Sequence, residues 1–180
     1  MEDWNTKDNK ITFKGYHDRS RIMFLTNYLG HSDPYLKIEA RFGFTKLDSA
    51  GSAGFEIGVM DSLDPSVKAA AYYGKGIPAG VSVTGKLFLH KSQMDLPDQF
   101  NYDNFLLIIQ GDNTQLGLKA VDKDGNEASI TAKLDHAPSG YISLMANFFG
   151  QYTSHFWVDD LRLTGKKWED KSENSFGPVL

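Results

Sequence analysis

Two adjacent acids near the end of the chain, Asp159 and Asp160, are the first residues whose types could do chemistry. They interrupt the segment HFWVDDLRLTG, residues 155–165. Neighbouring carboxylates can act as a general acid and base, or they can supply oxygen ligands to calcium. Both uses require a second group of ligands or acids nearby, and the sequence does not place one beside this pair.

The same pair of acids has a structural interpretation. In a strand, alternate side chains share a face, so Phe156 and Val158 lie on one side while Leu161 and Leu163 fall on the other. One extra residue at the acids, a β-bulge, would bring all four apolar side chains to the same core. We therefore predict that the acids form a bulge first of all, with chemistry as the alternative.

Three further segments resemble functional motifs without completing one. DKDGNE, residues 122–127, has the look of a calcium loop but lacks the full ligand pattern, so we predict a hairpin turn at Asp124–Gly125. GKGIPAG, residues 74–80, lacks the Lys-Ser/Thr of a phosphate-binding loop and is predicted to be a loop with positive φ. GDN, residues 111–113, is a fragment of a phosphoesterase motif at an expected turn.

Composition excludes several classes of function. The chain has 180 residues, 41% of them hydrophobic, and a net charge of -4. This balance argues against nucleic acid or an anionic membrane as the main partner, because both require a basic surface. The chain has no cysteine, which removes disulfides, thiol nucleophiles and Cys-zinc sites. No apolar run is long enough for a membrane span.

The elements that must position these residues are strands. Apolar residues alternate with polar ones from Leu36 to Thr45, which predicts a half-buried strand. NFLLIIQ, residues 104–110, is apolar on both faces and is predicted to be central and covered. Roughly ten to thirteen short strands at this spacing, without a well-capped helix, predict an all-β fold, an antiparallel β-sandwich over residues 1–165.

The tail, residues 166–180, changes character. A charged stretch, 166–174, precedes an apolar end, 176–180. We predict that it is a linker toward a further domain, and a frayed terminus is the alternative.

Residues 139–165, which hold the last two predicted strands, resemble the end of concanavalin A-like lectin/glucanase domains. The shared features are a strand that begins at a glycine, a loop, and an aromatic–Asp–Asp–aliphatic strand. The resemblance implies a concanavalin A-like jelly roll. It also implies that a ligand lies on the concave face of a sheet or at the loop rim.

A second resemblance covers most of residues 54–180. A first segment, residues 54–92, runs from GFEIGVM to LFLHKS, and FWVDDLRLTGKKW and SFGPVL follow it in this order. This arrangement resembles the N-terminal β-domain of bacterial alkaline phosphatase D-type metallophosphatases. The resemblance implies an exported protein, whether periplasmic, cell-surface or secreted, with its signal absent from these residues. It also implies a C-terminal catalytic domain that could act as a metal-dependent phosphatase or phosphodiesterase.

The residues do not support catalysis within this domain. Glucanases of the superfamily carry Glu-x-Asp-x-x-Glu, whereas Glu56 and Asp61 lie five apart on opposite faces of a regular strand. A dinuclear phosphatase site needs Asp, His and Asn clusters, and the five histidines are scattered without ligand spacing. We predict no catalytic residue and no metal ligand here. A structural calcium ion stays open, because backbone carbonyls and scattered acids can hold one.

Aromatic side chains are the remaining signal for binding. Flat amphipathic rings with polar groups nearby often hold sugars. The candidates for a ligand site are Tyr72, Tyr73, His90, Tyr152, His155 and Trp157. If the bulge is present, Trp157 points away from the core, where it lines a concave face or is covered by a loop.

The residues therefore predict a non-catalytic accessory domain. The second resemblance implies that it is the N-terminal part of an exported bacterial metallophosphatase, where it would bind glycan or support the catalytic domain. One alternative is a purely structural domain that packs on the C-terminal catalytic domain. Another is a glycoside hydrolase of the glucanase type, which would need two carboxylates in a cleft.

Overall fold

The computed structural model describes residues 4–8, 10–14, 21–29, 35–47, 51–58, 75–112, 114–136, 138, 140–146, 154–165 and 168–170. Of residues 21–29, 164–165 and 168–170 it describes only the backbone. The predicted hairpin turn and bulge lie within these ranges. Tyr72, Tyr73 and Tyr152 lie outside them.

The described residues form fourteen strands and no helix, so none could cross a membrane as a helix. The first seven strands are β1 (Trp4–Lys7), β2 (Lys10–Lys14), β3 (Arg21–Leu29), β4 (Leu36–Lys46), β5 (Ser52–Ile57), β6 (Ile77–Ser82) and β7 (Lys86–Leu89). The others are β8 (Ser92–Asp95), β9 (Phe105–Gly111), β10 (Gln115–Asp122), β11 (Glu127–Lys133), β12 (Gly140–Ala146), β13 (His155–Gly165) and β14 (Trp168–Asp170).

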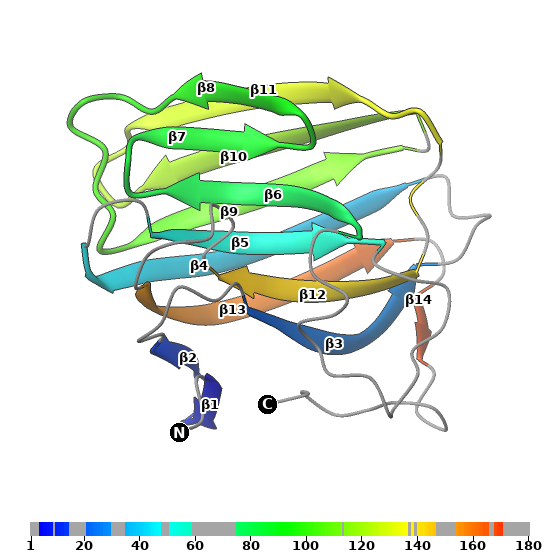
Figure 1. Cartoon of the computed structure of the whole chain (residues 1–180), viewed down its shortest axis with the longest axis horizontal. Helices are drawn as coiled ribbons and strands as arrows, with labels where there is room; N and C mark the ends of the chain where they lie inside the picture. Colours follow the sequence, from blue (N-terminus) through cyan, green and yellow to red (C-terminus); the bar gives the residue numbers. More distant parts are fainter. Residues whose placement is uncertain are drawn as a thin grey trace.

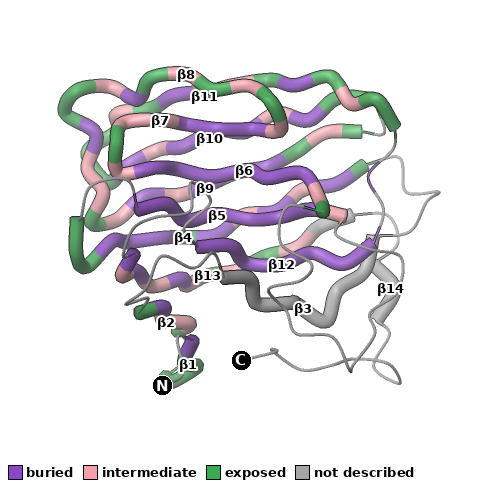
Figure 2. The backbone as a smooth tube through the Cα atoms, in the orientation of Figure 1, coloured by how far each residue is buried: buried purple, intermediate pink, exposed green. Residues whose placement is uncertain are grey.

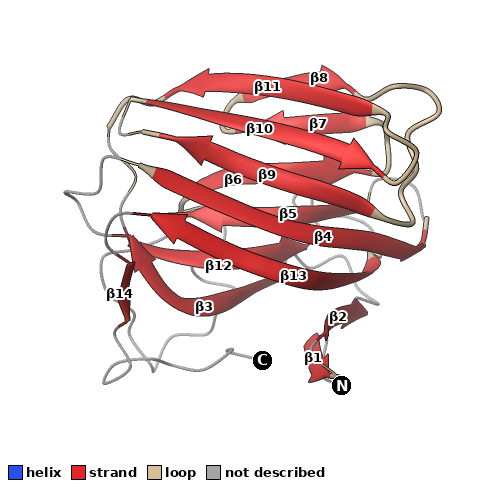
Figure 3. Ribbon diagram, turned by 180° about the vertical axis from the view of Figure 1, so that it is seen from behind, coloured by secondary structure: helices blue, strands red, loops and turns tan. Residues whose placement is uncertain are grey.

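The strands make two antiparallel sheets that pack face to face (Figures 1 and 3). Sheet A has the order β1-β2-β13-β4-β9-β10-β11, and sheet B has the order β14-β3-β12-β5-β6-β7-β8. At one side the edge strands β8 and β11 contact each other, which closes the sandwich there. The predicted antiparallel β-sandwich is thus confirmed. Three residues of the tail, as β14, pair with β3.

The core lies between the sheets and is rich in phenylalanine. Phe42 of sheet A meets Phe55 of sheet B edge to face, with ring centroids 5.6 Å apart. Phe105 stacks on Phe42 at 5.9 Å, and Phe156 lies 6.1 Å from it. Each of these rings is at most 1% exposed. A large aromatic side chain that is fully buried contributes on the order of 2–3 kcal/mol from its apolar area, so this cluster holds the two sheets together.

The bulge predicted at the two acids is present in β13. Asp159 lies opposite Arg41 and Arg162 opposite Glu39, so three steps along β13 match two steps along β4. Asp160 has a φ of 51°, in the left-handed region. Beyond the bulge, Leu161 packs against the core, as Leu163 does, together with the buried Phe156 and Val158.

Two segments differ from their predictions. The last part of GKGIPAG is not a loop, because residues 77–80 begin β6 in the interior of sheet B. Gly80 does not have a positive φ. A Cβ built on it would lie 2.3 Å from the carbonyl oxygen of Ala53 on β5, so close approach of the neighbouring strand requires glycine there. NFLLIIQ is central, as β9, but its outer face is not covered, since Leu106 and Ile108 are only half-buried.

Candidate functional site

The outer face of sheet A is an ordered array of side chains from four neighbouring strands. Residues directly opposite each other in adjacent strands share a face. Lys37, Gln110, Gly117 and Thr131 form one such row across β4, β9, β10 and β11. The next row along the strands is Glu39, Ile108, Lys119 and Ser129. The face therefore presents amides, hydroxyls and charges around an apolar residue of β9.

A gap in the first row forms the floor of a depression. Gly117 has no side chain, and a Cβ built on it would find its nearest neighbours, two carbonyl oxygens, at 3.7 and 3.9 Å. Those are ordinary van der Waals distances, and Gly117 does not have a positive φ. Neither packing nor backbone conformation therefore requires glycine at this position. A glycine inside a strand often marks a place where something else approaches the backbone closely.

Two adjoining depressions meet over this glycine, and together they are called the Gly117 hollow here. They share Gln110, Gly117 and Thr131. The first, of about 460 Å³, is also lined by Tyr35, Asp112, Thr114 and Gln115. The second, of about 310 Å³, is also lined by Lys37, Ile108, Leu118, Lys119, Ser129 and Ile130. Volumes of this size are typical of small-molecule sites.

Tyr35 provides the aromatic surface of the hollow. It directly precedes β4 and is 45% exposed, whereas most large apolar side chains of the described chain are buried. An exposed ring beside amide and hydroxyl groups offers a flat apolar face together with hydrogen-bond partners. Gln110 and Gln115 can each donate and accept hydrogen bonds, and the hydroxyls of Thr114 and Thr131 can do the same.

Asp112 shapes the rim of the hollow at the turn between β9 and β10. Its Oδ1 accepts hydrogen bonds from the Thr114 backbone N–H at 2.7 Å, the Thr114 hydroxyl at 2.7 Å and the Gln115 N–H at 3.0 Å. The hydrogen bonds from Thr114, followed by that from Gln115, lower the pKa of Asp112 below its ordinary value. The carboxylate thus stays ionised and fixes the turn that carries Thr114 and Gln115.

Trp157 lies on the outer face of sheet A, as expected for a residue between the buried Phe156 and Val158, but at a distance from the hollow along the sheet. It pairs with Gly43 of β4, and a Cβ on Gly43 would lie 2.3 Å from Cε2 of the indole. The Lys10 ammonium lies 4.8 Å from the centroid of the ring. The indole is partly buried between these neighbours, and it lines neither depression of the hollow.

The other described candidates do not converge on one place. His155 lies two residues before Trp157 on β13 and is partly buried. His90 lies at the turn between β7 and β8 in sheet B, with a φ of 55°. The structure therefore brings His155 and Trp157 onto one strand and leaves His90 on the other sheet.

Sequence reasoning missed the residues of the hollow. They come from four strands and two turns, and only the register brings them together. One signal was present: QLGLKAV, residues 115–121, has a glycine at an outward position of an alternating strand. A glycine there has no role in the core, so it could have been singled out as a place for a ligand.

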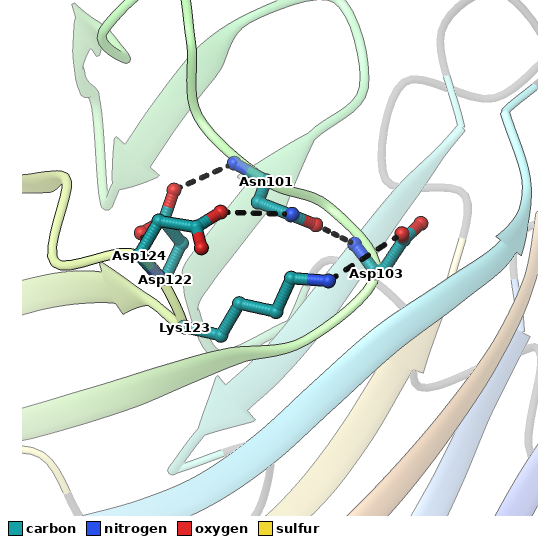
Figure 4. Close-up of polar contacts among 5 residues, drawn as sticks. All are labelled: Asn101, Asp103, Asp122, Lys123 and Asp124. Carbon is teal, nitrogen blue, oxygen red and sulfur yellow. Dashed lines mark hydrogen bonds and ion pairs between the residues drawn. The ribbon is translucent and has the colours of Figure 1, made fainter.

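The predicted hairpin turn at Asp124–Gly125 is present and is built on Asp122, which Figure 4 shows beside Asp124 and hydrogen-bonded to Asn101. Asp122 Oδ1 accepts the N–H groups of Asp124 and Asn126, at 2.9 and 2.8 Å. Its Oδ2 accepts the N–H of Asn101 at 2.7 Å and the Asn126 side-chain amide at 2.9 Å. Burial acts to raise the pKa of Asp122, but these hydrogen bonds together lower it. Within the described residues, no group of three or more acids or histidines could hold a metal ion.

The comparisons with known proteins show similarity of fold. No protein-family model matches the chain, and no curated protein matches its sequence. The metal-free lectin I-B4 from Griffonia simplicifolia superposes with a TM-score of 0.61 at 8% identity, over 92% of this chain and 91% of that chain. Peanut lectin with a nine-residue peptide superposes with 0.60 at 10% identity, over 92% and 90%.

A carbohydrate-binding module of Bacillus subtilis, CBM66, is also similar. It superposes with a TM-score of 0.50 at 10% identity, over 89% of each chain. Because these identities are low, the similarities establish the architecture. The predicted fold class is confirmed: the chain is a concanavalin A-like jelly-roll sandwich, the fold of these lectins.

Proposed function

We propose that this domain binds glycans and that the Gly117 hollow is the binding site. The observation that carries the proposal is the open floor at Gly117. A strand residue that neither packing nor φ requires to be glycine leaves room on an otherwise filled face. The lectins and the carbohydrate-binding module that share the fold support glycan as the class of ligand.

The chemistry of the lining suits a sugar. A pyranose has an apolar face and a rim of hydroxyls, so it needs a flat ring on one side and donors and acceptors around it. Tyr35 offers the ring, and Gln110 and Thr131 flank the floor with an amide and a hydroxyl. Bridging waters can complete the remaining hydrogen bonds, because the hollow is open to solvent.

The same lining favours binding over cleavage. Glycoside hydrolysis requires two carboxyl groups on either side of the scissile bond. Among the residues that line the hollow, Asp112 is the single acid, and its Oδ1 already accepts three hydrogen bonds. Of the two acids considered for a glucanase, Glu56 is fully buried in sheet B, and Asp61 lies outside the described residues.

The wider context remains a proposal that rests on the metallophosphatase resemblance. In that setting the domain belongs to an exported protein, residues 166–180 lead to a C-terminal catalytic domain, and the phosphatase chemistry lies outside residues 1–165. A glycan-binding domain would then hold the enzyme close to a glycan-rich surface.

The test is a glycan-array screen of the wild-type domain, followed by calorimetric titration of the best ligand into three variants. Gly117→Val fills the floor of the hollow, Tyr35→Ala removes the ring, and Thr6→Val is a control at an exposed position on β1. We expect each of the first two variants to lose at least tenfold in affinity with an unchanged unfolding temperature, and the control to bind as the wild type does. Wild-type affinity in Gly117→Val, or no glycan retained by the wild type, would refute the proposal.

A further inference from the structure

A third depression lies beside the hollow, at the β13 bulge, and is called the bulge depression here. It has a volume of about 180 Å³ and is lined by Glu39, Arg41, Leu106, Asp160 and Arg162. Glu39 is the next outward residue of β4 after Lys37, and Leu106 the next of β9 before Ile108, both of which line the hollow. The two sites therefore adjoin along the same pair of strands.

The bulge determines which side chains reach this depression. Without the bulge, that is with regular alternation through all of these residues, Leu161 would point outward and Arg162 toward the core. With it, Arg162 lies opposite Glu39 on the outer face, and Asp160 adopts a φ of 51° beside Arg41. Bulges commonly re-aim a side chain in this way near functional sites.

Among the charged side chains that line the bulge depression, one cation is not part of an ion pair in the described structure. Glu39 is the cross-strand neighbour of Arg162, but its carboxylate lies 3.0 Å from the Lys37 ammonium. Asp160 lies 3.8 Å from Arg41. In the part of the chain that the structure describes, Arg162 is exposed and takes part in no ion pair. Both acids of the depression thus have a basic partner, whereas the Arg162 guanidinium has no acidic partner among the described residues.

The whole outer face of sheet A is also more basic than the protein. The outward positions of β2 and β13 hold Lys10, Lys14 and Arg162, and those of β4, β10 and β11 hold Lys37, Arg41, Lys119 and Lys133. The acids on the same face are Glu39, Glu127, Asp159 and Asp160, together with Asp112 at the rim of the hollow. Basic residues outnumber acidic ones here, whereas the whole chain has a net charge of -4. An excess of one sign on one face attracts ligands of the opposite sign.

We propose that the ligand is an acidic glycan whose carboxylate or sulfate group binds at the bulge depression to Arg162. This inference rests on the proposed function of the Gly117 hollow. The planar guanidinium can donate two parallel hydrogen bonds to either group, a geometry that an ammonium cannot match. Leu106 provides an apolar floor, and the adjoining hollow holds the neutral part of the same chain of sugars.

The experiment compares matched ligands and matched variants. The ligands are a polyuronate with its carboxyl-reduced neutral form, and a sulfated polysaccharide with its unsulfated parent. The variants are Arg162→Gln and Lys133→Gln, which remove the same charge from the same face, the second at a position that lines neither site. Affinity is measured by calorimetry at low and at high salt.

We expect the acidic form of one pair to bind at least tenfold more tightly than its neutral form, with the advantage reduced by salt. Arg162→Gln should abolish that advantage, and Lys133→Gln should keep most of it. The pair that shows the effect distinguishes a carboxylate from a sulfate. Equal binding of acidic and neutral forms, or equal effects of the two variants, would overturn this inference and leave the proposed function standing. Failure of all four ligands and of a glycan array would overturn both.

Discussion

The two outer faces of the sandwich differ in a way that their residue types do not suggest. On sheet A, β4, β9 and β10 alternate between buried and half-exposed residues, as a strand with one solvated face should. On sheet B, β5, β6 and β12 are buried at every position, which Figure 2 shows as continuous purple. One face is thus available to a ligand in the described structure, and the central strands of the other are not.

The solvated face contains apolar residues and the buried face contains polar ones, the opposite of what their exposure would suggest. The solvated face of sheet A includes Leu106 and Ile108, whereas the buried outer side of sheet B includes Ser52, Glu56 and Ser143. A buried polar group is tolerated when it has hydrogen-bond partners. Glu56 Oε1 accepts the Gly76 N–H at 2.8 Å, and the Ser143 hydroxyl donates to the Glu56 carbonyl oxygen at 3.3 Å. Polar side chains can therefore lie on the covered face, because backbone groups of neighbouring residues pair with them.

Insertion of one alanine between Asp160 and Leu161 should disrupt the solvated face most severely. The bulge accommodates one extra residue, so a second would turn Leu161 and Leu163 outward and Arg162 inward, and we expect the free energy of unfolding to fall by about 3 kcal/mol or more. Chemical denaturation measures the loss. The control is Asp160→Gly, which keeps the bulge and suits the positive φ; it should change stability by less than about 1 kcal/mol. Equal stability of the insertion variant and the control would contradict the view that the bulge sets which side chains of β13 face the core.

Two glycines on the face of sheet A should respond in opposite ways to the same change. Gly43→Ala should destabilise by about 1–3 kcal/mol, because its Cβ would lie 2.1 Å from the Asp103 carbonyl oxygen and 2.3 Å from the Trp157 indole. Gly117→Ala should be neutral or slightly stabilising, since its Cβ meets nothing closer than 3.7 Å. Thermal unfolding of the two variants side by side tests this difference. A large loss in Gly117→Ala would show that the hollow has a packing role.

Two glutamates on opposite outer faces provide a matched pair. Glu56→Ala should cost about 2 kcal/mol, because the Gly76 N–H loses its acceptor beside a buried strand. Glu39→Ala on sheet A should cost less than about 1 kcal/mol, because its ion pair with Lys37 is partly exposed. Urea denaturation measures both. Similar losses of unfolding free energy in the two variants would contradict the conclusion that the outer face of sheet B is buried and that of sheet A is solvated.

A substitution in the β10–β11 turn, which joins two strands of the hollow, should lower the free energy of unfolding by a smaller amount that depends on pH. The pKa of Asp122 is lower in the folded chain than the value of about 3.9 in an unfolded one. Its contribution is therefore fully present above that unfolded value and is lost as pH falls through the folded pKa. Asp122→Asn should cost about 1 kcal/mol at pH 7, and the difference from wild type should shrink toward pH 2.

Calorimetric unfolding temperatures from pH 7 to pH 2 check this dependence. The control is Asp135→Asn, a change at an exposed position outside the turn, which should follow the wild type throughout. A gap between Asp122→Asn and wild type that stays constant with pH would contradict the role of the ionised carboxylate.

Local patterns predicted much of the fold. The phase change around Asp159 and Asp160 predicted the bulge, and Asp124–Gly125 predicted the hairpin, because both depend on a few adjacent residues. The covering of β9 was predicted wrongly, since two apolar faces in a strand do not reveal what lies over them. GKGIPAG was also misinterpreted, because the glycine that a neighbouring carbonyl requires looks the same in sequence as a glycine in a loop.

The candidate site could not be predicted in the same way. Gln110, Gly117 and Thr131 lie together only because β9, β10 and β11 pair in one register, and register over several strands is a property of the whole fold. The aromatic candidates were chosen by residue type alone. Of those within the described residues, His90 and Trp157 lie on different sheets.

The most direct test of the account is to ask which outer face responds to a glycan. Backbone amide shifts of the isotope-labelled protein would be followed by NMR during titration with the best ligand from the array. If the glycan binds in the Gly117 hollow, the largest changes fall on Gln110, Gly117 and Thr131, with little change on β5 and β6. Changes concentrated on sheet B, with the amides around Gly117 unmoved, would contradict it.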